Sequence, residues 1–267
     1  MEKIGLIAGN RKFPLLVCEG AKKNAISVVA IAVKSETSPR INLLAERVYW
    51  LKLTDFKHVF TLFKKEGIKK VVMAGQISPW RLFSKEVRNN LYLQEILSNI
   101  QNKKADTIFG AIAQKLEEEG LELLDSTLFI REHIPKKGVL TQSGPTKEVW
   151  EDINFGFELA KAIGALDIGQ TVAVKDKTVI AVEAFEGTDN LIKRAGRLAG
   201  KGFVLVKTAK PKQDMRFDIP VVGLNTVKGL IKKGAECLAF EAERTLFIDA
   251  QEAIRLADKR GLKIVAV

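Results

Sequence analysis

The chain has 267 residues, 46% of them hydrophobic and 28% charged, which is enough apolar material for a sizeable core and excludes a disordered protein. Its net charge of +11, from 43 basic and 32 acidic residues, favours an anionic partner: a nucleic acid, an acidic membrane surface or a phosphorylated small molecule. The two cysteines and two histidines have no ligand spacing. This argues against a disulfide framework and a thiolate or imidazole metal centre, and leaves oxygen ligands for any metal chemistry.

Strand-like and helix-like stretches alternate through the first half of the chain. Apolar runs predict strands at 4–8, 27–33, 47–53 and 70–74, and helices are expected at 14–23, 55–66, 84–101 and 105–119. A strand that is apolar throughout is typical of a parallel sheet covered on both faces. The first half therefore predicts a Rossmann-like, doubly wound α/β domain.

Two loops that follow strands of this half are candidates for ligand contact. The first contains Gly9 and leads into a helix that opens at Pro14, an order of elements that binds phosphate at a helix N-terminus. The second, Gly75-Gln76, follows the fourth strand and could face the same crevice. An ordinary turn between strand and helix has the same appearance, because no G-x-G-x-x-G fingerprint is present.

The second half predicts a separate domain of mixed α/β type. Residues 133–144 contain a proline, two glycines and two lysines, and are expected to link a domain at 1–132 to one at 145–267. Helices are predicted at 146–163, 190–199, 227–233 and 250–259, and strands at 171–174, 178–184, 203–206, 220–223 and 263–267. The first two of these strands are expected to form a hairpin, and a further hairpin is expected around 242–244.

Two polar clusters follow apolar strands of this second half. The first is Glu186-Gly187-Thr188-Asp189, and the second comprises Lys207, Lys210, Gln213, Asp214, Arg216 and Asp218. Open α/β sheets bind ligands at strand ends. Carboxylates hold Mg²⁺, whose coordination is usually completed by substrate phosphates, and lysine and arginine neutralise phosphate oxygens. The alternative is that both clusters are solvated loops with incidental ion pairs.

The segments LDIGQTVAVKDKTVIAVEAFEGTD and KTAKPKQDMRFDIPVVGLNT closely resemble the hallmark segments of the LpxI family. The members are UDP-2,3-diacylglucosamine pyrophosphatases of lipid A biosynthesis in Gram-negative bacteria. The opening LIAG, the later Pro14 and the Ala74-Gly75 loop also fit, so the similarity covers nearly the whole chain. One departure is Arg11, because the family often has a second glycine two positions after Gly9.

The resemblance implies a Mg²⁺-dependent hydrolase, with Mn²⁺ as a substitute, that cleaves UDP-2,3-diacylglucosamine to UMP and 2,3-diacylglucosamine 1-phosphate (lipid X). It further implies an N-terminal nucleotide-binding domain, a C-terminal lipid X-binding domain and attack by water on the β-phosphorus. The essential aspartate of the family corresponds to Asp218. The EGTD motif matches Glu186 and Asp189, so Asp189 and Asp218 are the expected catalytic and metal-binding residues.

The remaining expectations concern substrate contacts, partners and location. The expected substrate-contacting residues are Gly9, Asn10, Pro14, Gly75, Gln76, Gln170, Glu186, Gly187, Thr188, Lys207, Lys210, Gln213 and Arg216. No signal-peptide pattern or membrane-length apolar run is present, which predicts a cytoplasmic protein at most peripheral to the inner membrane. Homodimerisation is left open.

Two rival functions are weighed against the enzyme. A nucleic-acid module would require a basic stripe with interleaved aromatic residues, which the sequence lacks. A non-catalytic nucleotide or lipid carrier is the main alternative. Asp218 disfavours it, because a carboxylate beside a pyrophosphate opposes simple binding.

Overall fold

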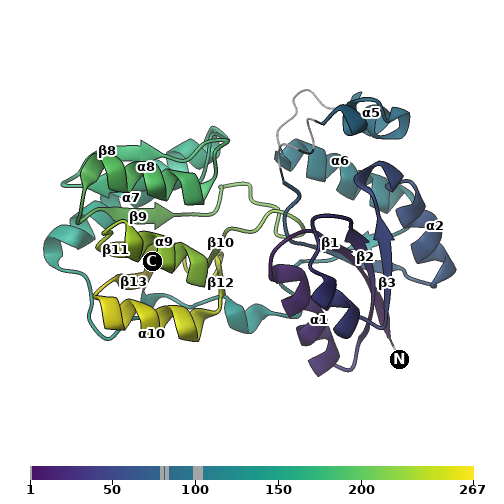
Figure 1. Cartoon of the computed structure of the whole chain (residues 1–267), viewed down its shortest axis with the longest axis horizontal. Coiled ribbons are helices and arrows are strands. Elements are labelled where there is room, and N and C mark those ends of the chain that lie inside the picture. Colours follow the sequence, from purple (N-terminus) through teal and green to yellow (C-terminus); the bar gives the residue numbers. More distant parts are fainter. Residues whose placement is uncertain (1, 79–80, 82–83, 99–104) are drawn as a thin grey trace. The chain divides into compact units, whose positions relative to one another are not determined.

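The computed structural model describes residues 2–78, 81, 84–98 and 105–267, and for 86, 96–98 and 105–107 the backbone alone. Contacts within the chain divide it into two compact units. Unit 1 comprises Met1–Arg131 and Asp214–Asp218, and unit 2 comprises Glu132–Gln213 and Ile219–Val267. The chain therefore leaves unit 1, returns to it for one short segment and ends in unit 2 (Figure 1).

Unit 1 is built on a five-stranded parallel sheet with the order β3-β2-β1-β4-β5. Its strands are β1 (Lys3–Ala8), β2 (Ser27–Val33), β3 (Arg47–Leu51), β4 (Lys70–Ala74) and β5 (Glu122–Leu123). Its helices are α1 (Phe13–Lys23), α2 (His58–Lys65), α4 (Lys85–Arg88), α5 (Leu91–Ser98) and α6 (Ala105–Glu118), with 3-10 turns η1 (Pro39–Leu43) and η2 (Leu53–Asp55). A third 3-10 turn, η3 (Arg131–His133), lies where the chain leaves the unit.

Both faces of this sheet are covered, which is why its central strands are apolar throughout. Figure 1 shows α1 and α2 on opposite faces. Phe60 and Phe63 of α2 and Leu116 of α6 belong to one buried cluster with Ile31 and Met73 of the sheet. The Rossmann-like, doubly wound fold is confirmed, and its strand order reverses between β1 and β4, the position at which such folds bind ligands.

The backbone at Arg11, where the resemblance leads one to expect glycine, adopts a conformation that suits glycine. Its φ is 67°, in the left-handed region where a side chain is disfavoured and glycine is not. The helix expected at 55–66 begins later, because η2 precedes it and α2 starts at His58.

Unit 2 contains a six-stranded mixed sheet with the order β6-β13-β11-β9-β7-β8, and a separate parallel pair, β10 and β12. Its strands are β6 (Gly138–Val139), β7 (Thr171–Lys175), β8 (Thr178–Val182), β9 (Val204–Lys207), β10 (Val221–Gly223), β11 (Cys237–Phe240), β12 (Leu246–Ile248) and β13 (Lys263–Ala266). Its helices are α7 (Lys147–Ala165), α8 (Thr188–Ala199), α9 (Leu224–Lys232) and α10 (Ala250–Arg260). The mixed α/β class predicted for this half is confirmed.

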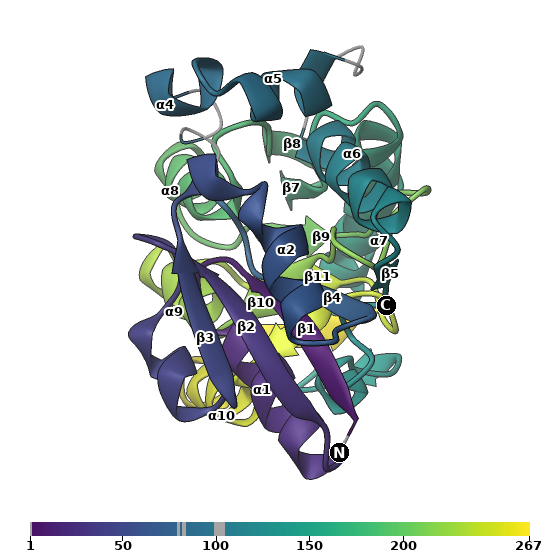
Figure 2. The ribbon, with the colours of Figure 1, turned by 90° about the vertical axis from the view of Figure 1, so that its right-hand side faces the viewer.

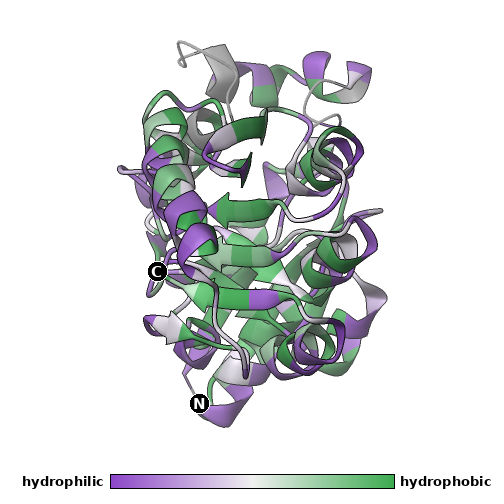
Figure 3. Ribbon diagram, turned by 90° about the vertical axis from the view of Figure 1, so that its left-hand side faces the viewer, coloured by the Kyte–Doolittle hydropathy of each residue, from purple (hydrophilic) through white to green (hydrophobic). Residues whose placement is uncertain are grey.

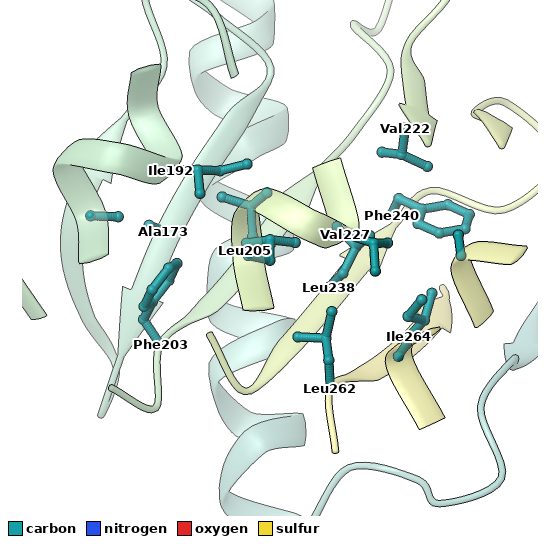
Figure 4. Packing of buried hydrophobic residues seen from close by; sticks show 14 of the residues in the cluster. Ala173, Ile192, Phe203, Leu205, Val222, Val227, Leu238, Phe240, Leu262 and Ile264 are labelled. Atoms are coloured by element: carbon teal, nitrogen blue, oxygen red, sulfur yellow. The ribbon is translucent and has the colours of Figure 1, made fainter. Parts of the chain in front are cut away.

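Helices cover both faces of the larger sheet as well. Figure 4 shows one side of the packing, where Leu205, Leu238 and Ile264 of the strands meet Ile192 of α8 and Val227 of α9. The opposite side packs against α7. Figure 3 shows that the strands of this unit are mostly hydrophobic and that its helices carry both hydrophilic and hydrophobic residues. This is the pattern expected of helices that bury one face.

The structure confirms one predicted hairpin and contradicts the other. Strands β7 and β8 pair antiparallel, and Asp176 and Lys177 form the turn with φ values of 51° and 54°, as a two-residue hairpin turn requires. The hairpin expected around 242–244 is wrong: β11 belongs to the larger sheet, whereas β12 pairs in parallel with β10. The apolar run of β12 has a distant partner that local spacing cannot reveal. The segment 133–144, assigned to a linker, contains β6, which pairs with β13.

Candidate functional site

The loops after β1 and β4 meet where the strand order of unit 1 reverses. Gly9 N donates to Ala74 O over 2.8 Å, and Asn10 N donates to Gln76 O over 2.7 Å. A Cβ on Gly9 would lie 2.5 Å from Gln76 O, and one on Gly75, whose φ is +84°, would lie 2.5 Å from Asn10 O. The structure thus brings these four predicted residues together. The backbone donors of Gly9 and Asn10 are used within the protein, however, so they do not form a phosphate cradle.

A buried carboxylate that the sequence analysis did not single out, Glu36, joins the loops around this point. Its side chain is 3% exposed. Its Oε2 accepts from Asn10 Nδ2 at 2.8 Å and from Ser78 Oγ at 3.0 Å, and its Oε1 lies 2.8 Å from Arg81 Nε. An acidic residue shortly after β2 is the signal that could have found it, because dinucleotide-binding folds place a ribose-binding carboxylate there. Here the carboxylate holds protein loops together.

An apolar pocket lies beside these loops within unit 1. The carboxyl ends of β1, β2 and β4 line it together with Phe56, and Phe109 and Ile112 of α6 line the other side. Phe217, from the short returning segment, completes the lining. Every described residue of the lining is apolar or glycine. Figure 2 shows α4 and α5 beyond the carboxyl ends of the strands.

The segment Asp214–Asp218 is anchored in unit 1 through its backbone. Ser126 is fully buried, its N–H donates to Met215 O over 3.1 Å, and its Oγ lies 2.5 Å from Arg216 O. The amide of Asp218 donates to Asp214 O over 2.9 Å, which closes a turn. The Phe217 ring lies 6.3 Å from the Phe109 ring, between centroids. The segment therefore places Phe217 in the lining of the apolar pocket, with Asp218 as the next residue of the chain.

Arg216, an expected substrate contact, is engaged by two carboxylates. Its Nη2 donates to Asp214 Oδ2 over 2.8 Å, its Nε lies 3.0 Å from Asp214 Oδ1, and its Nη1 donates to Glu117 Oε1 over 2.6 Å. The guanidinium lowers the pKa of Asp214, and the hydrogen bonds that it donates to both carboxylates raise the pKa of Arg216. In this structure its charge therefore anchors the segment to α6.

Unit 2 contains a buried polar cluster at the carboxyl end of β9. Lys207 and Glu183 are 6% and 7% exposed, and they are joined through a threonine hydroxyl. Lys207 Nζ donates to Thr188 Oγ1 over 2.9 Å, and Thr188 Oγ1 donates to Glu183 Oε1 over 2.6 Å. Within the described part of the chain, no other acceptor is assigned to the Lys207 ammonium, which has three protons. A buried cation with unused donors is suited to bind an anion.

The surroundings of this cluster strengthen its polar character. Thr188 opens α8, whose N-terminus favours anions, and Gly187 at the cap position has a φ of 78°. Gln170 Oε1 and Thr208 Oγ1 are buried, and no partner among the described residues reaches either atom. Glu183 was missed by the sequence analysis because it lies at the end of an apolar run, one residue beyond β8. Its burial beside Lys207 depends on non-local pairing.

The other polar residues of the two clusters serve mainly local structure. Glu186 pairs with Arg194 further along α8. Lys210 Nζ donates to Asp167 Oδ1 over 2.7 Å, and Lys210 N donates to Gln213 Oε1 over 2.6 Å. These bonds shape the loop that follows β9.

Pro14, Asp189 and Asp218 lie on three different segments of the chain. Pro14 is buried in the first turn of α1, and Asp189 lies in the first turn of α8. Asp218 belongs to unit 1 and Asp189 to unit 2. The predicted catalytic pair is therefore divided between the two units.

The metal that the resemblance implies can be tested against these donors. Over the described ranges, no three Asp, Glu, His or Cys side chains are grouped so that they could hold a metal by themselves. Mg²⁺ is usually bound by one or two carboxylates, water and substrate phosphates, so a small carboxylate set suffices. Glu183 Oε2 is buried, and no donor among the described residues reaches it. An oxygen of this kind is a suitable cation ligand, and the donor set fits Mg²⁺ bound mainly through substrate.

The fold defines a two-unit α/β protein with a buried polar cluster at a strand end of unit 2 and an apolar pocket at strand ends of unit 1. The LpxI N-terminal domain family matches residues 3–133, and the LpxI C-terminal domain family matches residues 136–265. The chain therefore belongs to the LpxI family. It is 28% identical over 277 aligned residues to the UDP-2,3-diacylglucosamine pyrophosphatase LpxI of Caulobacter vibrioides, covering 100% of this chain and 98% of that protein.

Similarity to solved structures is slight. The biotin carboxylase domain of a thermophilic 2-oxoglutarate carboxylase bound to ADP gives a TM-score of 0.28 at 18% identity, covering 65% of this chain and 34% of that one. Phosphoribosylglycinamide synthetase from Anaerococcus prevotii gives 0.27 at 13% identity, covering 73% of this chain and 44% of that one. Such low scores carry no argument. Within the described ranges, no helix combines the length and the apolar character needed to cross a bilayer.

Proposed function

We propose that this protein hydrolyses the pyrophosphate of UDP-2,3-diacylglucosamine and releases UMP and 2,3-diacylglucosamine 1-phosphate. The observation that carries the proposal is the match to both LpxI domain families along nearly the whole chain. The name and near-complete coverage of the Caulobacter relative supply the substrate. The absence of a Ser–His pair or reactive cysteine from the sequence pattern favours attack by water over a covalent intermediate.

The residues of the site are assigned roles that suit this reaction. Lys207, buried at the carboxyl end of β9 and bonded to Thr188 at the start of α8, neutralises phosphate oxygens of the substrate. Asp218, held in a short anchored segment, orients the attacking water or binds a metal, and Asp189 is the second proposed metal ligand. Mg²⁺ or Mn²⁺, when bound, supplies positive charge to the phosphate oxygens and favours deprotonation of water.

We also propose a peripheral, transient association with the cytoplasmic face of the inner membrane. The substrate carries two acyl chains and is expected to reside in the bilayer. The net charge of +11 supports attraction to anionic lipid headgroups. Vesicles with and without anionic lipid, sedimented with the protein at low and high salt, test this association.

The function is tested by incubating the purified protein with UDP-2,3-diacylglucosamine in mixed micelles and Mg²⁺, and identifying the nucleotide released. UMP is expected, and its release should stop with EDTA and return with added Mg²⁺. Release of UDP in place of UMP would contradict the proposed reaction. Release of UMP at full rate in EDTA would contradict its metal dependence. Tight substrate binding with no product would favour the carrier instead.

Asp218→Asn tests the catalytic assignment without a change in side-chain size. We expect kcat to fall about a thousandfold, equivalent to about 4 kcal/mol, while substrate Kd and Tm stay close to wild type. Asp258→Asn is the matched control, since Asp258 accepts a hydrogen bond from Gln142 N, which an asparagine oxygen can also accept. An unchanged kcat in Asp218→Asn, or a loss of binding equal to the loss of rate, would defeat the assignment.

A further inference from the structure

The parallel ladder between β9 and β11 ends at the start of the second polar cluster, where Glu241 N donates to Lys207 O over 3.0 Å. If the ladder continued regularly, Ala209 N would donate to Glu241 O, and Glu243 N would donate to Ala209 O. The chain instead turns away from β9. Glu243 has a φ of 59°, and its N–H donates to Pro135 O over 2.9 Å. The backbone of Ala209 is therefore held by other groups.

An ion pair of two side chains, Lys161 on α7 and Glu241, binds both polar groups of the Ala209 backbone. Ala209 N donates to Glu241 Oε2 over 2.7 Å, and Lys161 Nζ donates to Ala209 O over 3.1 Å. The ammonium also donates to Glu241 Oε1 over 2.7 Å and to Oε2 over 2.6 Å. An ammonium can only donate and an ionised carboxylate can only accept, so chemistry fixes the direction of each bond. The ion pair replaces the next two bonds of the ladder.

Stability alone does not account for a charged pair at this position. The side chains of Lys161 and Glu241 are 27% and 12% exposed, so both charges lose much of their hydration. Replacing a buried ion pair by well-packed apolar side chains is often neutral or stabilising. Ala209 is fully buried, however, and apolar neighbours would leave its N–H and C=O without partners. The contribution specific to this ion pair is therefore to fix the backbone at Ala209.

We propose that Lys161 and Glu241 are positioning residues for Lys207, a role that rests on the proposed function. Glu241 holds the chain on both sides of Thr208, because its N–H binds the carbonyl oxygen of Lys207 and its carboxylate binds the N–H of Ala209. The end of β9, which carries the Lys207 ammonium, is thereby fixed to β11 and α7. A strand end that frays would move this ammonium away from the phosphate oxygens that it neutralises.

Hydrogen exchange at the Ala209 amide tests the backbone contact without any need for turnover. In the wild-type protein this amide should be protected, although it lies beyond the last residue of β9. Exchange as fast as in an unstructured peptide would overturn the proposal, and this measurement needs no variant.

Two double variants separate the backbone contact from the ion pair. Lys161→Met/Glu241→Met removes both charges, and Lys161→Glu/Glu241→Lys restores an ion pair with the donor and the acceptor exchanged. We expect both to fold and both to lose protection at Ala209. Glu236→Gln is the matched control, since Glu236 pairs with Lys263 at the opposite end of β11, and it should keep that protection. Wild-type protection in either double variant would show that the ion pair does not hold Ala209.

Kinetics and anion binding test the link to Lys207. At a temperature well below Tm, each double variant should lower kcat/KM for UMP release roughly tenfold to a hundredfold, the order of loss that a displacement of about 1 Å produces. Glu236→Gln should keep the wild-type value. In a Lys207→Met background, Lys161→Met/Glu241→Met should cause no further loss, whereas multiplication of the two losses would refute positioning through Lys207.

The same cycle of variants can be measured by calorimetry as Kd for inorganic pyrophosphate. Weaker binding to the double variants, with no further weakening in the Lys207→Met background, is the expected result. Equal Kd in the wild-type protein and both double variants would overturn the proposal. Because pyrophosphate binding and hydrogen exchange need no turnover, their failure is distinguishable from a failure of the wild-type protein to release UMP.

Discussion

Replacing Glu36 by alanine is predicted to destabilise unit 1 more than any change to its surface charges. The Glu36 carboxylate is 3% exposed and joins its own loop after β2 to two others, through Asn10 after β1 and through Ser78 and Arg81 after β4. Its removal leaves Asn10 Nδ2 and Ser78 Oγ without that acceptor and takes away the carboxylate that lies 2.8 Å from Arg81 Nε. A buried donor that loses its partner costs the full desolvation of that group.

The expected loss of unfolding free energy in Glu36→Ala follows from the burial of the carboxylate. Removing one partner of a buried ion pair typically costs about 3–5 kcal/mol. Arg81 is 27% exposed and can recover some hydration, so we expect the lower end of that range, about 3 kcal/mol. For a unit of this size, 1 kcal/mol corresponds to roughly 3 °C in Tm, which predicts a decrease of about 10 °C in the melting of unit 1.

Calorimetry with hydrogen exchange checks this prediction, because the two units can unfold separately. Amides of the loops after β1 and β4 should lose protection in Glu36→Ala, whereas those of unit 2 should not. Glu46→Ala is the control: Glu46 pairs with Lys3 at the surface, with 42% of its side chain exposed. A Tm change in Glu36→Ala no larger than in Glu46→Ala would refute the reasoning that burial makes the carboxylate structural.

Two further predictions concern close packing and burial. Gly9→Ala should lower Tm strongly or prevent folding, because its Cβ would lie 2.5 Å from a backbone carbonyl oxygen. A Cβ on Gly110 would have nothing within 4 Å, so Gly110→Ala should be neutral or stabilising. Equal Tm changes in the two variants would contradict the packing argument. Burial raises the pKa of the Cys18 thiol to about 12 and also raises the pKa of the Cys237 thiol. Neither thiol should therefore react with a thiol reagent at pH 8 until denaturant is added. Rapid labelling of the native protein would disprove this prediction.

The fold of unit 1 could be predicted because its signals are local. The run SVVAIAV of β2 is apolar at every position, and helices with one apolar face separate such runs. In unit 2 the same reasoning found the β7–β8 hairpin, whose turn is only Asp176 and Lys177. It failed at β12, because the partner strand β10 is distant in sequence.

The site was only partly predictable for the same reason. Strand-end glycines and the motif residues at 186–189 and 207–218 can be read from the sequence. That Arg216 would be neutralised by Glu117, almost a hundred positions earlier, cannot be read from it. Burial of Glu36 and Glu183 is equally non-local, because each carboxylate becomes structural only when another loop or strand covers it.

Packing of Phe217 should position Asp218, because the two residues share one short anchored segment of unit 1. The Phe217 ring lies 6.3 Å from the Phe109 ring, between centroids, and lines the apolar pocket. Removal of the ring should therefore loosen the segment that carries the proposed catalytic carboxylate, and we expect Phe217→Ala to lower kcat. Phe56→Ala removes an aromatic ring from the same pocket but not from this segment, and should leave kcat close to the wild-type value. If both variants, shown to be folded by their Tm, keep the wild-type kcat, packing of Phe217 does not position Asp218.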